Sequence, residues 1–131
     1  MIIPCEIAVK SVLPAVKALM AKELIEKHGL KQDEAAEILG ISQSAVSKYT
    51  RKVRGYIIKI DDIEEIEPLI DKMIGSLVDR TYQRTDFLRY FCQTCMTIRK
   101  TTIMCQFCQK TDPKIKSEKC DFCTSLNPTV K

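Results

Sequence analysis

Residues 32–49 read QDEAAEILGISQSAVSKY, and this stretch predicts two short helices joined by a tight turn. The first helix is expected over 32–39, and Gly40 follows it where a left-handed backbone costs glycine little. The second helix is expected to begin after Ser42, whose hydroxyl can accept a hydrogen bond from an amide two or three residues later. The residue types therefore specify both the helices and the turn between them.

Small and apolar side chains occur in this stretch where two crossing helices need them. Ala36 allows a close approach, and Ile41 and Val46 can fill the space between the helices. Leu39 and Tyr49 complete the packing face. The pattern predicts a helix-turn-helix unit, with an ordinary helical hairpin that carries a solvated basic face as the alternative.

Polar side chains of the second helix are left facing outward, and they are Gln43, Ser44, Ser47 and Lys48. A helix fits the major groove of DNA, where glutamine can pair with adenine and serine or lysine can reach base edges or phosphates. Cations continue beyond the helix and suit phosphate contacts, and Gln32 is placed to bond the DNA backbone. The predicted DNA-binding residues are Gln32, Ser42, Gln43, Ser44, Ser47, Lys48, Arg51, Lys52 and Arg54.

The surrounding stretch PCEIAVKSVLPAVKALMAKELIEKHGLKQDEAAEILGISQSAVSKYTRKVRG, residues 4–55, resembles archaeal XRE-type helix-turn-helix transcriptional regulators, including the DNA-binding half of archaeal thiamine-biosynthesis regulators. The resemblance covers under half of the chain. It implies a dimeric repressor or activator that reads a double-stranded operator through Gln43, Ser44, Ser47 and Lys48. The chain then departs from those relatives, because a cysteine-rich tail stands in place of a thiamine-phosphate-binding domain. The effector is therefore not implied.

Length and composition favour a small, mainly α protein. The chain has 131 residues, 45% of them hydrophobic and only 6% aromatic, with no Trp, so its core must be built from aliphatic side chains. This length excludes a large multidomain enzyme. The net charge is +4 over residues 1–60, −4 over 61–91 and +4 over 92–131. We expect a helix-turn-helix domain over 1–60, a helical linker and dimerisation segment over 61–91, and a cysteine-rich metal- or cluster-binding tail over 92–131.

Helices are also expected on both sides of the helix-turn-helix unit. Apolar spacing predicts one helix over 12–28, ended by Gly29. A short β-favouring stretch at 56–60 leads into an acidic helix start, where Pro68 restarts the helix. The apolar stripe of this segment is Ile66, Leu69, Ile70, Met73, Ile74, Leu77 and Val78. We expect a helix through Phe87, Leu88 and Phe91 to cover part of the stripe and a second chain to cover the remainder, giving a homodimer.

Three C-x-x-C pairs follow, separated by nine and eleven residues, and we predict that they bind a metal: Cys92, Cys95, Cys105, Cys108, Cys120 and Cys123. A two-residue spacer places both sulfurs on one side of an ion, and this tail lacks a core of its own. Zinc is favoured, with a [4Fe-4S] or [2Fe-2S] cluster as the alternative. Met96, Gln109 and Thr124 stand where zinc knuckles often carry glycine.

Any two pairs can supply four ligands and leave the third as a dithiol able to close into a disulfide, which would make a redox switch. We expect the first two pairs to form the core of the site, because residues 96–104 between them read as a small β-hairpin. Neighbouring cations that either offset thiolate charge or are simply solvated are Arg89, Arg99, Lys100, Lys110 and Lys119. Cys5 is expected to be a small buried apolar residue, with a free thiol on the dimer surface as the alternative. His28 is not expected to be a ligand.

These features favour a sequence-specific DNA-binding transcriptional regulator whose cysteine pairs sense redox or metal state. The alternative is a structural zinc-ribbon adaptor that docks on the transcription machinery without sensing. An enzyme is not expected, because no strand-helix-strand pattern surrounds a C-x-x-C pair, and no small-molecule substrate is evident. The first residues resemble neither a signal peptide nor a membrane span, so we expect a cytoplasmic protein.

Overall fold

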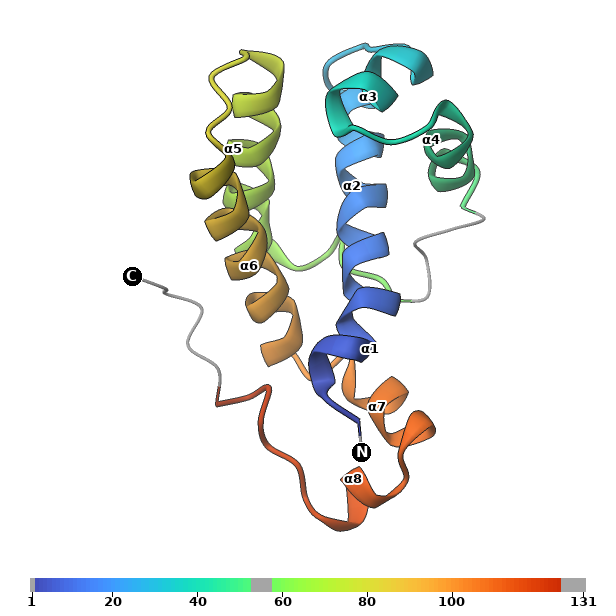
Figure 1. Ribbon diagram of the computed structural model, residues 1–131, viewed down its shortest axis with the longest axis vertical. Helices are drawn as coiled ribbons and strands as arrows, with labels where there is room; N and C mark the ends of the chain where they lie inside the picture. The colour runs from blue at the N-terminus through green and yellow to red at the C-terminus, as the bar shows by residue number, and fades with distance from the viewer. Residues whose placement is uncertain (1, 53–57, 126–131) are drawn as a thin grey trace.

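The protein is described by a computed structural model that covers residues 2–52 and 58–125. Within these ranges the chain is helical and forms no strand, which confirms the mainly α fold (Figure 1). The elements are α1 Pro4–Lys10, α2 Val12–Glu26, α3 Gln32–Leu39, α4 Gln43–Thr50, the 3-10 helix η1 Glu64–Ile66, α5 Glu67–Val78, α6 Arg84–Lys100, α7 Cys105–Thr111 and α8 Lys114–Ser117.

Helix α2 is the centre of the fold, because it contacts α1, α3, α4, α5 and α6. The helix expected over 12–28 is confirmed at its start and ends two residues early, at Glu26; Gly29, at φ +66°, follows in the turn. Helix α1 was not predicted; Pro4 stands in its first turn, where a missing amide hydrogen costs nothing. Ser11 separates α1 from α2, and its hydroxyl donates to the Ile7 carbonyl at 2.7 Å.

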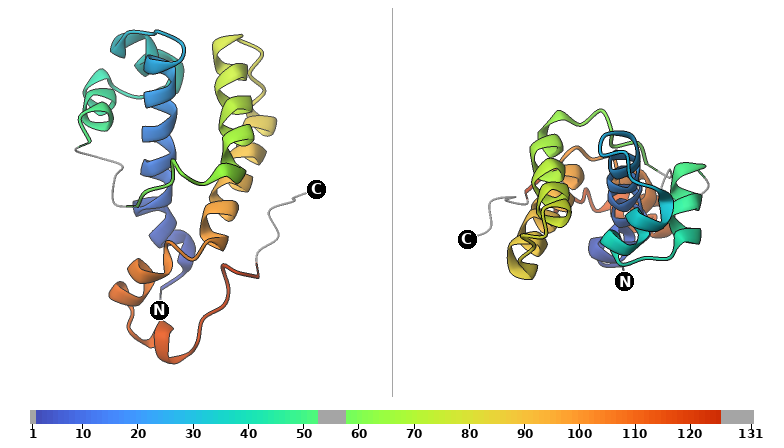
Figure 2. Two further views of the ribbon diagram at one scale, coloured as in Figure 1. Left: turned by 180° about the vertical axis from the view of Figure 1, so that it is seen from behind. Right: turned by 90° about the horizontal axis from the view of Figure 1, so that it is seen from above.

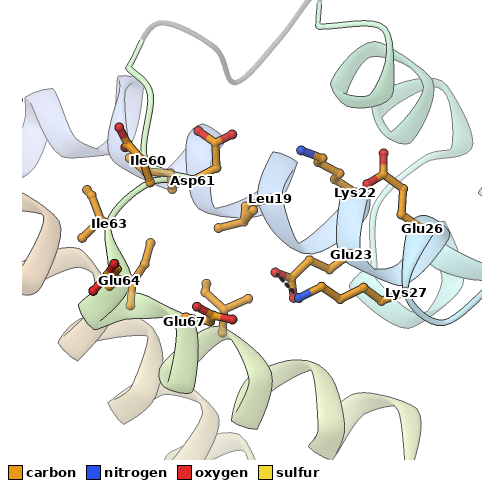
Figure 3. Close-up of a pocket in the computed structure, with 13 residues that line it drawn as sticks. Leu19, Lys22, Glu23, Glu26, Lys27, Ile60, Asp61, Ile63, Glu64 and Glu67 are labelled. Atoms are coloured by element: carbon orange, nitrogen blue, oxygen red, sulfur yellow. Dashed lines mark hydrogen bonds and ion pairs between the residues drawn. The ribbon is translucent and has the colours of Figure 1, made fainter.

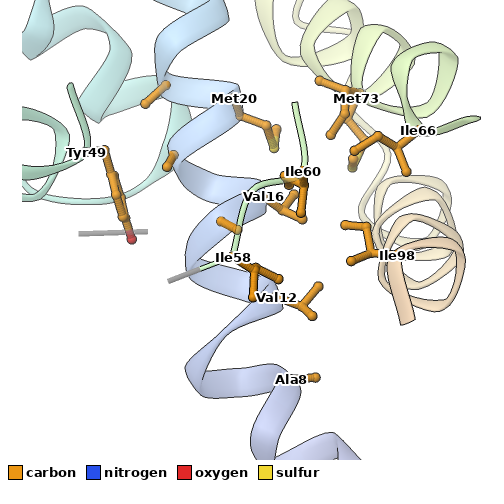
Figure 4. Packing of buried hydrophobic residues seen from close by; sticks show 14 of the residues in the cluster. Ala8, Val12, Val16, Met20, Tyr49, Ile58, Ile60, Ile66, Met73 and Ile98 are labelled. Carbon is orange, nitrogen blue, oxygen red and sulfur yellow. The ribbon is translucent and has the colours of Figure 1, made fainter. Parts of the chain in front are cut away.

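Helices α5 and α6 form an antiparallel pair beside α2, as the two views of Figure 2 show. The expected apolar stripe on η1 and α5 is confirmed, with Ile66, Ile70, Met73 and Ile74 each at most 1% exposed. Its other members, Leu69, Leu77 and Val78, are half-buried. Figure 4 shows this stripe meeting side chains of α2 and α6. Burying such aliphatic side chains contributes about 2 kcal/mol each, so the pair is held to α2 mainly by apolar contact.

The β-hairpin expected over 96–104 is wrong, because α6 continues to Lys100. Thr94 and Ile98, four residues apart, lie on the same face of a helix and are fully buried. The hydroxyls of Thr94 and Thr97 donate to carbonyls four residues back, at 2.7 and 2.8 Å, so the helix satisfies them. Helical packing therefore overrides the β preference of the threonines and isoleucines.

The β-favouring stretch expected at 56–60 lies partly outside the described residues. Its described part, 58–60, forms no strand. Ile58 and Ile60 are each 4% exposed, and they lie against α2 beside Val12 and Val16 (Figure 4). These residues serve as a buried connection between the helix-turn-helix segment and α5.

The two ends of α2 carry different parts of the chain. Helices α3 and α4 pack at one end, while α1, α7 and α8 lie at the other (Figure 1). Buried residues from α1 through Cys123 belong to one hydrophobic cluster. None of the described helices is both long enough and apolar enough to cross a lipid bilayer.

Candidate nucleic-acid interface and thiol cluster

The turn between α3 and α4 has the predicted geometry. Gly40 adopts φ +67° and ψ 32°, and the amide of Ile41 behind it donates to the Ala36 carbonyl at 3.0 Å. The amide of Ala45 donates to the Ser42 hydroxyl at 3.0 Å, so Ser42 caps α4. These bonds satisfy backbone groups that the helix ends would otherwise leave unpaired.

The inner faces of α3 and α4 are packed as predicted. Val46 is fully buried, Ala36 and Tyr49 are 5% and 6% exposed, and Leu39 and Ile41 pack half-buried against them. Helix α4 contacts both α2 and α3. Its orientation is therefore determined from two sides, which leaves one face open.

The open face carries the predicted polar residues. Ser42, Gln43 and Ser44 are exposed, and Ser47 and Lys48 are half-buried. The sequence of α4, QSAVSKYT, contains no acidic residue. A negative DNA backbone could therefore approach this helix without meeting a carboxylate on it.

The remaining members of the predicted DNA-binding set have varied surroundings. The Nε of Arg51 donates to the Ser47 hydroxyl at 3.1 Å, which holds the guanidinium beside α4. Lys52 is exposed at φ +60°.

The Nε2 of Gln32 donates to Thr50 Oγ1 at 3.4 Å, so this side chain already has a partner inside the protein. Arg54 lies outside the described residues.

The second and third cysteine pairs lie at the end of α2 opposite to α3 and α4. Their four members line one cavity of about 60 Å³, namely Cys105, Cys108, Cys120 and Cys123. The first two belong to α7, and the others to the turns that follow α8. Thus the second and third pairs share a cavity, whereas the sequence had favoured the first and second pairs as the core. The first pair lies on α6.

The thiols in this cavity influence one another. Burial raises the pKa of Cys108, and the neighbouring Cys123, Cys105 and Cys120 raise it further by charge repulsion. Burial likewise raises the pKa of Cys105, with smaller contributions from Cys123 and Cys120. In the described part of the chain, no group of three or more ligating side chains is already arranged to hold a metal ion.

Arg99 connects the cavity to α1. It is 5% exposed, and its Nε and Nη1 donate to the sulfurs of Cys123 and Cys5 at 3.4 and 3.6 Å. The guanidinium carbon lies 5.7 Å from the centroid of the Phe122 ring. Burial opposes the charge of Arg99, but Cys123 and Cys5 raise its pKa on balance.

The other expected cations do not share this arrangement. Arg89 pairs with Asp86 at 3.4 Å on the surface, and Lys100, Lys110 and Lys119 are exposed. Cys5 is exposed, so the expectation that it is buried is wrong; it lies near the start of α1, where its sulfur accepts from Arg99. Sequence patterns carried no signal for this contact, because 94 residues separate its two members.

A second, open cavity of about 520 Å³ lies between α2 and the segment that leads into α5. Figure 3 shows Glu23, Lys27 and Glu67 at its wall. Glu23 and Lys27 form an ion pair at 3.4 Å, while burial raises the pKa of Glu23 on balance. The sequence did not predict this cavity, since its walls come from distant parts of the chain.

Comparison with known proteins concerns the first half of the chain. A family model described as helix-turn-helix matches residues 22–67, which run from within α2 to the first residue of α5. No curated protein and no solved structure matches the chain. The matched segment contains α3, the Gly40 turn and α4 in full. Residues 22–67 therefore form a helix-turn-helix domain.

Proposed function

We propose that the protein is a sequence-specific DNA-binding transcriptional regulator that reads double-stranded DNA with α4 and responds to metal or redox state through its cysteine pairs. The observation that carries the proposal is the helix-turn-helix domain at 22–67, whose second helix presents Gln43 and Ser44 to solvent. In such units the N-terminal residues of the second helix contact base edges.

Base contacts are assigned to one side of α4. Gln43 and Ser44 stand in its first turn and reach the major groove first, with Ser47 one turn further on. Val46 and Tyr49 hold the opposite side against α2 and α3, so the helix can approach DNA from one direction only. A bidentate glutamine–adenine pair contributes about 1–3 kcal/mol of discrimination.

Phosphate contacts are assigned to the cations at the end of α4. Lys48, Arg51 and Lys52 lie within the five positions 48–52, which contain no acidic residue. The bond from Arg51 to Ser47 keeps one guanidinium along the helix, where it can neutralise a phosphate. Such contacts strengthen binding to every sequence and make binding depend on salt.

A homodimer is part of the proposal, because two recognition helices double the length of DNA that is read. Leu88 and Tyr82 are 52% and 40% exposed around the start of α6 and provide apolar surface for a second copy. Two half-sites about one helical turn, roughly 34 Å, apart are then expected in the operator. Sedimentation of the wild type and of Leu88→Lys tests this, since a monomeric wild type would contradict it.

One observation favours a second candidate. The thiol cavity and α4 lie at opposite ends of α2, so the cysteine-rich end does not touch the recognition helix. This arrangement also suits an adaptor whose cysteines hold a structural zinc ion and dock on the transcription machinery without sensing. The two candidates differ in whether the metal state changes DNA affinity.

The test uses the full chain and a labelled duplex from its own promoter. Fluorescence anisotropy over a salt series should show a negative slope of log K against log salt and a preference over random duplex. A slope near zero, or equal affinity for both duplexes, contradicts the DNA-binding proposal. Stripping metal or oxidising the thiols should shift operator affinity for a sensor, and unchanged affinity identifies the adaptor.

A further inference from the structure

The second and third cysteine pairs form a C-x2-C-x11-C-x2-C pattern, and the fold brings its four members to one cavity. Cys105 and Cys108 stand one turn apart on α7, and Cys108 is 5% exposed. Cys120 and Cys123 also line the cavity, with Cys123 7% exposed. Two thiol pairs that face one space supply the donors of a tetrahedral ion.

A second, independent observation is the buried charge of Arg99. Its Nη2 is buried and has no hydrogen-bond partner among the described residues. No carboxylate in the described ranges forms an ion pair with it; its contacts include the sulfurs of Cys123, Cys5 and Cys95 and the Phe122 ring. A buried guanidinium needs a negative partner, and neutral thiols do not provide one. Thiolates held by a metal ion provide this negative charge.

The backbone around the cavity is strained at two places. Thr102, which lines the cavity, has φ +66°, an unusual conformation for a β-branched residue. Lys119, which precedes Cys120, has φ +54°. Such conformations cost about 1–3 kcal/mol each and persist where the surroundings require them, commonly at binding sites. Both residues adjoin the chain segments that carry the cysteines.

We propose that Cys105, Cys108, Cys120 and Cys123 are the four ligands of one zinc ion, and that Arg99 offsets part of the charge of this site. On binding, each thiol gives its proton to the solvent and forms a Zn–S bond, so the filled site is doubly negative. Cys92, Cys95 and Cys5 are not ligands.

The ligands must move together when the ion binds, since no three of them are yet arranged around one point. A tetrahedral site with Zn–S bonds of about 2.3 Å brings its sulfurs to roughly 3.8 Å from one another. The turn after Cys120 is internally bonded, because Thr124 and Ser125 donate to the carbonyls of Asp121 and Phe122, both at 2.8 Å. It can therefore close on α7 as a unit.

The first measurement is zinc content of the full chain, purified under reducing conditions, with a matched pair of double variants. Cys105→Ser with Cys120→Ser removes one ligand from each proposed pair at its less buried cysteine. Cys92→Ser with Cys95→Ser removes the other pair and serves as the control. The wild type and the control should hold stoichiometric zinc, and the first variant should lose most of it. Zinc loss in the control alone would overturn the assignment.

The second measurement needs no variant and so does not depend on whether a variant folds. The wild type is alkylated with and without zinc, and each cysteine is quantified by mass spectrometry. Zinc should slow the reaction of Cys105, Cys108, Cys120 and Cys123 by at least about tenfold and leave exposed Cys5 and Cys92 unchanged. Protection of the first pair by zinc, or an iron- and sulfide-containing brown protein, would overturn the proposal.

The assignment rests on the metal-binding part of the proposed function and is independent of DNA binding. Neither measurement contains DNA, so their outcome stands even if the operator experiment fails. If zinc binds at these four cysteines and operator affinity does not depend on it, the site is assigned and the sensing role fails. If the protein binds its operator but does not bind zinc, the zinc assignment fails and the DNA-binding proposal stands.

Discussion

The Nε2 of Gln32 donates to Thr50 Oγ1 at 3.4 Å, so the first residue of α3 is bonded to the last residue of α4. Thr50 in turn donates to the Ser47 carbonyl at 3.0 Å. Thr50→Val removes the acceptor and leaves a half-buried amide unpaired, which should lower the free energy of unfolding by about 1 kcal/mol. Urea unfolding measures this change. Thr50→Ser keeps the hydroxyl and should lose less stability.

Two glycines should respond in opposite directions to the same substitution. An added Cβ meets nothing within 4 Å at either Gly40 or Gly75, so sterics with neighbours do not decide the outcome. Gly40 has φ +67°, and Gly40→Ala should destabilise by about 1 kcal/mol. Gly75 lies inside α5, and Gly75→Ala should stabilise by about 0.5–1 kcal/mol through reduced backbone entropy of the unfolded chain.

Thermal unfolding of both variants checks this pair. Gly40→Asn is the control for the turn, since asparagine tolerates the left-handed region and should cost less than alanine. A Gly75→Ala variant that is less stable than wild type would mean that another surface, such as a second copy of the chain, packs closely on that face of α5.

Gln43 and Arg51 should affect DNA binding in different ways. Gln43→Ala should reduce the preference for the operator over random duplex by about 1–3 kcal/mol, because a base contact is lost. Arg51→Ala should weaken all duplexes similarly and reduce the salt slope by about one, because a phosphate contact is lost. Anisotropy titrations with both duplexes separate the two effects. Equal behaviour of the two variants would argue against α4 as the recognition helix.

Glu23 should make stability depend on pH in a defined direction. Its pKa is raised, mainly by burial, so the native state holds this proton more tightly than the unfolded state. The contribution of Glu23 to stability therefore falls as pH rises from the ordinary glutamate range, about 4.3, through the raised pKa. Glu23→Gln should be more stable than wild type at pH 7, and the difference should vanish below pH about 4.

Melting temperatures at several pH values measure this effect. Glu26→Gln changes an exposed carboxylate of the same cavity wall and serves as the matched control. A Glu23→Gln variant that is less stable than wild type at pH 7 would show that the ion pair with Lys27 outweighs the burial of the carboxylate.

Arg99 should affect metal affinity without being a ligand. Its Nε bonds the Cys123 sulfur, and loss of such an outer partner typically weakens metal binding by about 10–100-fold. Arg99→Gln should therefore weaken zinc binding in a competition titration, and Arg99→Lys, which keeps the charge, should weaken it less. Equal zinc affinity in wild type and Arg99→Gln would show that the guanidinium serves folding alone.

Local patterns were enough to predict the helix-turn-helix domain. Gly40, Ser42 and Val46 act within a few residues of their own position, through a backbone conformation, a cap and an i, i+3 or i+4 packing face. Such effects are encoded in short windows, so the bounds of α3 and the start of α4 follow from the sequence. The burial of Ile70 and Met73 followed from helical periodicity in the same way.

Contacts between residues far apart in the sequence could not be predicted from local patterns. Spacing alone shows that Cys105 and Cys120 belong to pairs, and it does not show which pairs meet. That depends on where α6 ends, and its helical continuation to Lys100 was missed because threonine and isoleucine favour strands in isolation. The contact from Arg99 to Cys5 is a product of the whole fold, and no window of sequence contains it.

The 15 residues of α2 make a rod about 22 Å long that carries the helix-turn-helix unit at one end and lies near α7 at the other. A tilt of about five degrees at its base would displace the far end by about 2 Å, enough to take a side chain out of reach of a base edge. In the proposed sensor, leverage of this kind would transmit a small rearrangement of sulfur atoms to the recognition helix without any contact between the two.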